Sequence, residues 1–316
     1  MMPGLANRLA DAGVLGINKR NAEYTLKYNP RRLYPLVDDK LRTKELARAA
    51  GIAVTELYTV IEIQKQVREL HARVKERPDF VVKPARGSGG DGILVITGRY
   101  KNGYRKASGL LMTEEALELH VSDILGGIFS LGGEQDRAIV EYRVQFDPLF
   151  EAVTYQGVPD IRIIVFMGVP VMAMVRLPTR MSEGRANLHQ GAIGAGIDMG
   201  SGITLTAVWR NEIVEEHPDT GEHVSGIKIP GWDRLLALAS SCYELTGLGY
   251  QGVDIVLDRD KGPLILELNA RPGLNIQIAN HSGLLQRLKR VEENQDHFTD
   301  VESRVAFAKE HFRATS

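Results

Sequence analysis

The chain has 316 residues, with 39 Lys and Arg against 40 Asp and Glu, a formal net charge of −1, and 43% hydrophobic residues. This is an ordinary globular composition, and it excludes disorder as the main state. At roughly 100–200 residues per domain, the length predicts two lobes. The balanced charge leaves no basic excess to neutralise phosphates, so nucleic acid is not an expected partner.

Cysteine content and hydropathy point to a soluble protein of a reducing compartment. The one cysteine, Cys242, cannot form an intramolecular disulfide. It falls on the apolar face of a predicted helix that begins at Trp232, so we expect a core thiol rather than a nucleophile. The longest apolar stretch, 163–175, is interrupted by Gly168 and Pro170 and is too short to span a bilayer. We therefore expect a cytoplasmic protein with no membrane span; the sequence leaves self-association to a homo-oligomer open.

The first part of the chain predicts an arm followed by a mixed lobe. Residues 1–38 are polar and rich in turn formers, which favours an irregular, extended arm. Residues 39–137 combine helical and strand-like spacing around the glycine run 87–92 and form the expected first lobe. Helices are predicted over 41–50, 62–76 and the residues capped by Thr113, and strands over 80–83 and 93–97.

The remainder, residues 138–316, is rich in predicted strands that follow one another through tight turns. This pattern favours hairpins over strand-helix alternation, so we expect an α+β fold whose two lobes have mainly antiparallel sheets. Helices are expected from Trp232 and over 283–292 and 300–312. The strands are predicted over 138–142, 161–167, 171–177, 191–197, 203–209, 251–257 and 263–268.

The last predicted hairpin brings three oxygen-bearing side chains to one face. With residues 259–262 as its loop, Asp254 faces Glu267, and alternation puts Asn269 on the same side. Opposed carboxylates repel unless a cation lies between them, and such oxygens suit Mg²⁺ or Mn²⁺. We predict a divalent metal site there; the alternative is a solvated face with ordinary acids. The opposite face is predicted to be apolar, with Val253, Ile255, Leu257, Leu264, Leu266 and Leu268.

A second hairpin carries a pair of cations. A turn at 168–170 places Arg162 opposite Arg176 on one face. Two cations held together need an anion nearby, and guanidinium geometry suits phosphate or carboxylate. Both arginines are therefore candidate catalytic residues, with splayed, solvated side chains as the alternative.

The glycine run includes Gly87, Ser88, Gly89 and Gly90 and follows Lys83 in the sequence. Glycines let backbone N–H groups approach phosphates closely, and Lys83 adds positive charge. Residues 87–92 also match the GxGxxG dinucleotide pattern, which leaves an NAD-dependent dehydrogenase as an alternative. That pattern should open a helix, whereas a strand is predicted here. We therefore expect residues 87–92 to form a flap that links two antiparallel strands and covers a triphosphate. The alternative is a mobile hairpin tip.

Five motifs occur in order along the chain. They are the glycine flap after a strand lysine, Ile139-Val140-Glu141-Tyr142, Asp160-Ile161-Arg162, Asn187-Leu188-His189-Gln190-Gly191, and the final hairpin running into Ala270-Arg271-Pro272-Gly273. This succession resembles the ATP-grasp superfamily and, within it, the α-L-glutamate ligases that extend a ribosomal protein's C-terminus. The resemblance covers about 39–273 and implies an ATP-grasp fold, with ATP and Mg²⁺ or Mn²⁺ bound in a cleft between the lobes.

The resemblance also implies roles for single residues on the nucleotide side of this cleft. Lys40 is similar to the family's first phosphate-binding lysine, with Lys44 as an alternative, and Lys83 to the strand lysine at the α-phosphate and adenine edge. The flap is similar to the family's lid. Adenine contacts are implied for Glu141 and Tyr142, a ribose contact for Asp160, and further ATP contacts for Arg185 and Asn187.

On the reaction side, Asp254, Glu267 and Asn269 match the family's metal ligands, and Arg176 and Arg271 resemble groups that hold the acyl phosphate and the substrate. Those ligases usually carry a separate N-terminal domain, whereas 39 residues precede Lys40 here. The arm is therefore expected to replace that domain.

The function implied is a carboxylate–amine ligase that forms an amide or peptide bond through an acyl phosphate. An amino acid such as glutamate would be joined to an amine acceptor, with a small amino acid, a peptide or a protein as the substrate. The alternative is a non-catalytic, ATP-binding regulatory protein on the same fold.

Overall fold

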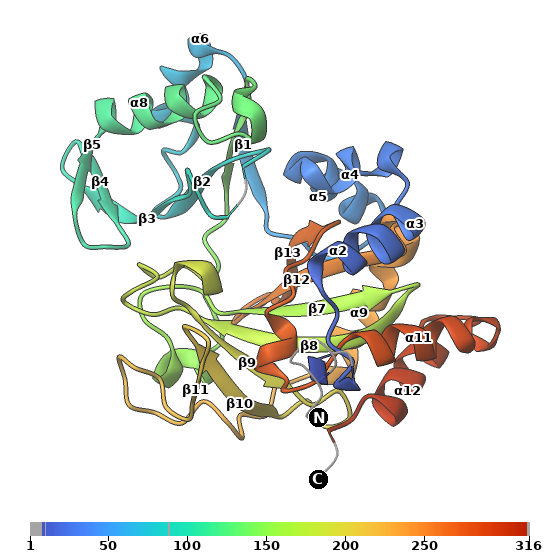
Figure 1. Cartoon of the computed structure of the whole chain (residues 1–316). Coiled ribbons are helices and arrows are strands. Elements are labelled where there is room, and N and C mark those ends of the chain that lie inside the picture. Colours follow the sequence, from blue (N-terminus) through green and yellow to red (C-terminus); the bar gives the residue numbers. More distant parts are fainter. Residues whose placement is uncertain (1–7, 10, 88, 315–316) are drawn as a thin grey trace.

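Two antiparallel sheets lie at the centres of two lobes in the computed structural model, which describes residues 8–9, 11–87 and 89–314 (Figure 1). All strand pairs within both sheets are antiparallel. This arrangement confirms the α+β fold class that the sequence predicts. The two lobes face each other across the region where the candidate site residues gather.

The first sheet has six strands in the order β1-β6-β2-β3-β4-β5. Helix α8 (Glu114–Leu125) covers it and buries Leu117, Val121 and Ile124 in the core of this lobe. As predicted, the Thr113 hydroxyl caps α8 by accepting a hydrogen bond from the backbone N–H of Ala116. The strands are β1 (Leu57–Ile61), β2 (Phe80–Pro84), β3 (Leu94–Tyr100), β4 (Gly103–Lys106), β5 (Leu111–Thr113) and β6 (Ala138–Glu141).

Two features of this lobe differ from the sequence prediction. The helix expected over 62–76 is divided into α6 (Gln64–Val67) and α7 (Leu70–Arg73). Strand β6 was expected to open the second lobe, but it lies between β1 and β2, where Val140 pairs with both Thr59 and Val82. The first sheet therefore extends to Glu141 rather than ending before residue 138.

The second sheet has seven strands in the order β11-β10-β9-β8-β7-β12-β13. Helix α12 (Val301–His311) packs on β8, and α9 (Trp232–Thr246) packs across β7, β8 and β12. Cys242 of α9 is fully buried, as predicted. No helix within the described residues is long and apolar enough to cross a membrane. The strands are β7 (Asp160–Phe166), β8 (Val169–Leu177), β9 (Ile193–Ile197), β10 (Thr204–Trp209), β11 (Glu212–Val214), β12 (Tyr250–Asp258) and β13 (Gly262–Asn269).

Shorter elements complete this lobe and its connections. They are η3 (Leu131–Gly133), η4 (Pro148–Val153), η5 (Leu188–Gln190), α10 (Ile276–Ala279), α11 (Leu285–Glu293) and η6 (Gln295–His297).

A bulge in β13 changes which side chains share a face of the last hairpin. Asp254 pairs with Glu267, as predicted, but Ile255 pairs with Ile265, so Leu266 is the extra residue. The connecting loop is correspondingly 259–261. Leu264 and Leu266 consequently pack with Val144 and Val256, not with the other apolar side chains of the hairpin. The prediction of one continuous apolar face was wrong because it assumed an unbroken register.

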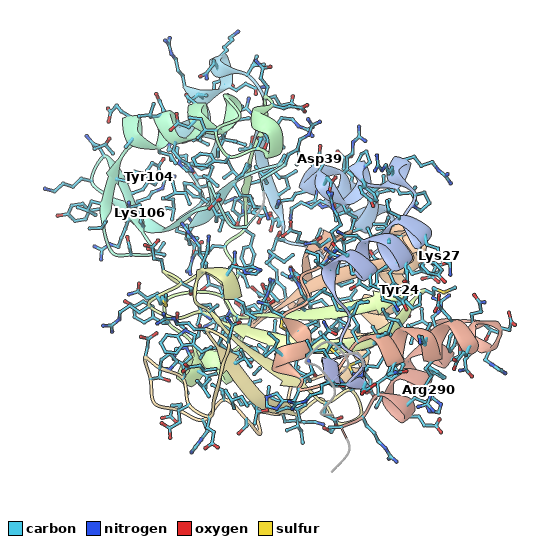
Figure 2. All side chains as sticks on the ribbon, viewed as in Figure 1. Tyr24, Lys27, Asp39, Tyr104, Lys106 and Arg290 are labelled. Atoms are coloured by element: carbon cyan, nitrogen blue, oxygen red, sulfur yellow. The ribbon has the colours of Figure 1, made fainter. Side chains whose placement is uncertain are left out.

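The N-terminal arm is helical where the sequence predicted an irregular, extended segment. Its described part is a chain of short helices that lies along the second lobe and ends beside the first (Figure 1). Tyr24 packs edge-on against Phe166 of β7, with ring centroids 5.5 Å apart, and Figure 2 shows it directed toward the second sheet. The helices of the arm are α2 (Ile17–Lys19), η1 (Arg20–Thr25), α3 (Leu26–Tyr28), η2 (Arg31–Leu33) and α4 (Pro35–Asp38). The next helix, α5 (Lys40–Ala49), is the one predicted over 41–50.

Buried polar contacts fix this arm to the segment that follows β13. The Asn29 amide donates to the backbone oxygens of Tyr250, at 2.6 Å, and Ala270, at 3.0 Å, and accepts from the Tyr250 N–H at 2.9 Å. Arg20 donates to the backbone oxygen of Pro272 at 2.7 Å. The arm therefore sets the position of residues 270–272, which adjoin the candidate site.

Candidate active site

Two buried lysines converge on one buried carboxylate beneath the flap. The Glu141 carboxylate on β6 lies 2.5 Å from Lys83 Nζ on β2 and 2.7 Å from Lys44 Nζ on α5, and it accepts a hydrogen bond from Thr55. Burial opposes ionisation of Glu141, but the two lysines outweigh it and lower its pKa. Burial also lowers the pKa of Lys44 to about 8. Two ammonium groups against one carboxylate leave an excess of positive charge, which an anionic ligand here would neutralise.

The flap between β2 and β3 reaches from the first lobe to the second. Lys40 Nζ donates to the backbone oxygen of Gly87 at 2.6 Å and lies 3.4 Å from Glu267 Oε1 on β13. The Asn187 amide donates to the backbone oxygen of Gly89 at 3.1 Å. Gly89 and Gly90 have φ angles of +67° and +88°, which favour glycine. The flap thus brings Lys40, Asn187 and Glu267 to one region; Ser88 lies outside the described residues.

Arg185 completes the flap surroundings. A Cβ added at Gly90 would lie 3.6 Å from Arg185 Cδ, so this side chain adjoins the flap tip. The Arg185 side chain is 41% exposed, and its Nη2 lies 3.9 Å from Glu183 Oε2. Surface pairs of this kind are weak, so Arg185 remains available to an anionic ligand.

A buried network joins two arginines and two aspartates at the centre of the second sheet. Arg162 binds both oxygens of Asp254, at 2.7 and 2.6 Å, and Arg176 donates to Asp254 Oδ2 at 2.8 Å. Arg176 also binds both oxygens of Asp160, each at 2.5 Å. Burial opposes ionisation of Asp254, but Arg162 and Arg176 outweigh it and lower its pKa to about 2.

This network corrects two expectations. Arg162 pairs with Met174 in the β7–β8 ladder, and Arg176 pairs with Asp160, so the arginines are diagonal neighbours rather than directly opposed. The anion that holds them together is Asp254 of the chain itself. Asp160 is 4% exposed, and each of its oxygens accepts a hydrogen bond from Arg176, so in this structure it holds that arginine.

The three predicted metal ligands differ in the groups that contact their side-chain oxygens. The Asp254 oxygens are taken by arginines, whereas the Glu267 side chain is 35% exposed with Lys40 beside it. Asn269 Oδ1 accepts from the backbone N–H of Arg271 at 2.8 Å. Within the described residues, no three His, Cys, Asp or Glu side chains form a metal cage. Mg²⁺ commonly binds one or two carboxylates together with substrate phosphates, so Glu267 and Asn269 fit an ion shared with a nucleotide.

The predicted adenine contacts lie at the junction of the lobes. The Tyr142 backbone N–H donates to the backbone oxygen of Glu56 at 2.8 Å, and Lys261 Nζ lies 3.8 Å from the centre of the Tyr142 ring. The Glu141 side chain is engaged by the two lysines. The carboxylate of Glu141 therefore neutralises lysines in this structure instead of facing an open pocket.

Arg271, in the segment that follows β13, lies beside the arm. Its guanidinium lies 5.3 Å from the centre of the Tyr34 ring, a cation–π arrangement. Arg271 and Lys40 both act electrostatically on Asp38 of α4. The arm therefore contributes both an aromatic surface and a carboxylate to this side.

Sequence reasoning missed several residues that shape the site. Lys44 appeared only as an alternative to Lys40, although both converge here from α5, four residues apart on one helix. That spacing is the signal that would have identified the pair. Arg20 and Asn29 carried no sequence signal, because the contacts that fix the arm join them to residues more than two hundred positions away.

Comparison with known proteins gives a family and a set of structural neighbours. A family model described as sugar-transfer associated ATP-grasp matches residues 19–293. No curated protein sequence matches the chain. Among solved structures, the chain is similar to the ATP-grasp ligase PsnB complexed with minimal precursor, at 17% identity and a TM-score of 0.45, covering 88% of this chain and 62% of that one.

Two further structures show the same range of similarity. D-cycloserine synthetase DcsG has 18% identity and a TM-score of 0.47, with 84% of this chain and 73% of that chain covered. The D-alanine-D-alanine ligase from Coxiella burnetii has 14% identity and a TM-score of 0.45, with 87% and 59% covered. The chain thus spans less than two thirds of the length of PsnB and of the Coxiella ligase.

Proposed function

The chain belongs to the sugar-transfer associated ATP-grasp family, and on that premise we propose that it is an ATP-dependent ligase that joins a carboxylate to an amine. One observation carries the proposal. Lys40 contacts the flap at Gly87 and the half-buried carboxylate of Glu267 at the same time. A lysine, a glycine-rich backbone and an acid that suits Mg²⁺ therefore meet between the lobes, as binding and transfer of a phosphoryl group requires.

In the proposed reaction, the substrate carboxylate attacks the γ-phosphorus of ATP, and the bond to the β-phosphate oxygen breaks, which gives an acyl phosphate and ADP. The amine then attacks the acyl carbon, the bond from that carbon to the phosphate oxygen breaks, and the amine loses a proton. Amide and phosphate are released. Such chemistry needs positioning and charge neutralisation more than a protein nucleophile.

The residues divide this work as follows. Lys83 and Lys44, with their excess positive charge around Glu141, hold the inner phosphates. Lys40, Gly87, Gly89 and Asn187 release their mutual contacts and turn to the outer phosphates.

Glu267 and Asn269 would hold Mg²⁺, which would supply charge neutralisation on the transferred phosphoryl group. Asp160 and Asp254 position Arg176 and Arg162, and we assign these two arginines to the transferred group. Arg271 holds the substrate carboxylate on the arm side.

For the donor, the resemblance to glutamate ligases supports an amino acid such as glutamate. For the acceptor, an amino acid, a peptide or a protein amine is proposed. PsnB is described as bound to a precursor, and the family is described by its association with sugar transfer, so peptides and amino sugars both belong among the acceptors tested.

The test measures ADP release from Mg·ATP with pairs of carboxylates and amines, together with hydroxamate formation when hydroxylamine replaces the amine. We expect release that needs both partners and hydroxamate that needs the carboxylate. Tight binding of Mg·ATP without release or hydroxamate from any pair would favour the non-catalytic alternative instead.

A further inference from the structure

The first stem of the flap, Arg86 and Gly87, is attached to the loop that joins α8 to β6, residues 126–137. The backbone N–H of Arg86 donates to Asp136 Oδ2 at 2.9 Å, and the Ser130 hydroxyl donates to the same oxygen at 2.9 Å. Gly87 and Ser130 also form an antiparallel β-bridge. Asp136 is 6% exposed, so one buried carboxylate fixes the first stem to this loop.

The second stem, Gly92, is held by two aromatic side chains of the same region. His120 Nε2, on α8, donates to the backbone oxygen of Gly92 at 3.0 Å. A carbonyl oxygen can only accept, so the His120 ring carries a proton on this nitrogen. The Phe129 ring centre lies 5.5 Å from that of His120, and a Cβ added at Gly92 would lie 2.6 Å from Phe129 Cγ. The second stem is therefore packed against α8 and its following loop.

The glycines between the stems are held differently. Among the described residues, a Cβ added at Gly89 would meet only Asn187 Nδ2, at 4.0 Å, and one at Gly90 only Arg185 Cδ, at 3.6 Å. A Cβ at Gly87, in contrast, would lie 2.3 Å from Pro84 Cγ. The flap thus has two closely packed ends on the first lobe, while Gly89 and Gly90 contact only side chains of the second lobe.

We propose that His120 and Asp136 are positioning residues of the nucleotide site, which hold the two stems so that the flap is ordered before a nucleotide binds. The inference rests on the proposed function, because it assigns residues that support the flap of that ligase. Both residues act through the flap backbone and are assigned no contact with the nucleotide. Neither belongs to the motifs that carry the family resemblance.

Ordering in advance has a measurable consequence for nucleotide affinity. A flap with a loosened stem must be ordered when the nucleotide binds, and that ordering opposes binding. The flap would cover the triphosphate both before and during phosphoryl transfer. Loosening a stem should therefore raise the KM for ATP and leave kcat nearly unchanged. A merely structural role would instead reduce the amount of folded enzyme, which lowers the apparent kcat at an unchanged KM.

The test at the second stem uses His120→Phe, which keeps an aromatic ring beside Phe129 but removes the donor, and His120→Gln, which restores an N–H donor. His71→Phe is the matched control. His71 lies in the same lobe and also makes side-chain hydrogen bonds, to Tyr104 at 2.8 Å and to Glu118 at 3.1 Å, neither of them in the flap. The KM for ATP and kcat are measured from ADP release, and the Kd of Mg·AMPPNP is measured by calorimetry.

We expect His120→Phe to raise both the KM for ATP and the Kd of Mg·AMPPNP at least threefold, with kcat within twofold of wild type. His120→Gln and His71→Phe should stay within twofold of wild type in KM and Kd. A Kd in His120→Phe equal to that in His71→Phe, or a lower kcat at an unchanged KM, would overturn the assignment of His120.

Trypsin tests the first stem directly, because Arg86 is the only Lys or Arg in residues 84–98. Cleavage after Arg86 in native buffer, identified by fragment mass, should be at least fivefold faster in Asp136→Ala than in wild type or His71→Phe. If Asp136→Ala does not fold, Ser130→Ala removes a partner of the same carboxylate, and the expected increase is at least twofold. Rates equal to the control would overturn the assignment of Asp136.

The binding and cleavage measurements keep the two proposals apart, since neither requires ligation. Weaker Mg·AMPPNP binding in His120→Phe, in a protein that forms no hydroxamate with any carboxylate, would support the positioning role and contradict the ligase. Hydroxamate formation by a protein whose Mg·AMPPNP affinity is unaffected by His120→Phe would support the ligase and contradict the positioning role.

Discussion

Replacing Asp254 by asparagine in the ligand-free protein distinguishes two roles of this residue, a metal ligand that faces Glu267 and a partner of Arg162 and Arg176. If Asp254 were one of two facing acids that wait for a metal ion, removing its charge would relieve repulsion from Glu267, and the metal-free protein would become more stable. In the structure, Asp254 instead accepts hydrogen bonds of 2.6–2.8 Å from Arg162 and Arg176. The variant should therefore be less stable.

The size of the loss follows from the charges of the network. Two arginines and two aspartates are neutral together, so Asp254→Asn leaves one uncompensated positive charge in a buried site. Breaking a buried pair from one side costs about 3–5 kcal/mol. Arg162→Gln combined with Asp254→Asn restores neutrality, so the double variant should lose about 1–3 kcal/mol less than the sum of the single losses.

Urea unfolding followed by tryptophan fluorescence, in buffer with a chelator and no nucleotide, gives these free energies. Trp209 and Trp232 both lie in the lobe that holds the network. Glu212→Gln, an exposed position on β11, serves as the control and should change stability by less than about 0.5 kcal/mol. An Asp254→Asn protein as stable as wild type, or more so, would refute the reasoning.

Four further outcomes are expected. Burial raises the pKa of Cys242 to about 12, so its thiol should not react with Ellman's reagent in the native protein and should react stoichiometrically in urea; reaction at a free-thiol rate in native buffer would contradict its core position. Glu267→Ala should abolish carboxylate-dependent ADP release with an unchanged urea midpoint, whereas near wild-type release would remove Glu267 from the metal site. Asn29→Ala removes three buried hydrogen bonds between the arm and the second lobe and should cost about 2–4 kcal/mol in urea unfolding; a loss below about 0.5 kcal/mol would show that these three hydrogen bonds do not hold the arm. The pKa of Lys44 falls from 10.5 to about 8 on folding, so the unfolded chain binds more protons than the folded protein between pH 8 and 10.5. The Lys44 contribution to stability should therefore rise with pH in this range, by up to roughly 3 kcal/mol. Urea unfolding at pH 8 and pH 10 should show the rise in wild type but not in Lys44→Met, and an equal change with pH in both proteins would argue against it.

The last hairpin shows how far sequence reasoning extends at the candidate site. Alternation and a tight loop were enough to place Asp254 opposite Glu267. The assumed loop was one residue too long. The extra residue Leu266 offsets this error for the pair of Asp254 and Glu267, which lie beyond the bulge, whereas Leu264 lies before the bulge and pairs one position away from its predicted partner. Local patterns therefore predicted the pairing of Asp254 with Glu267 correctly and the apolar packing of the hairpin incorrectly.

The arginine network shows where such reasoning stops. Two like charges on one hairpin indicated that an anion must lie near them, but the anion is Asp254 on β12, the neighbouring strand in the sheet though far along the chain. Pairing between distant strands is set by the packing of the whole sheet, which no local pattern in one sequence reports. The helical arm was missed for the same reason, since Arg20 and Asn29 are fixed by partners across the chain.

The contacts of the flap have a consequence for how a nucleotide enters. The carbonyl groups of Gly87 and Gly89 are both held by side chains that an incoming triphosphate would also attract, Lys40 and Asn187. On the proposed function, nucleotide entry is an exchange in which phosphate oxygens replace these two carbonyl groups as hydrogen-bond acceptors, at the cost of two hydrogen bonds. The donors that would hold the triphosphate are then the same ones that hold the flap in this structure.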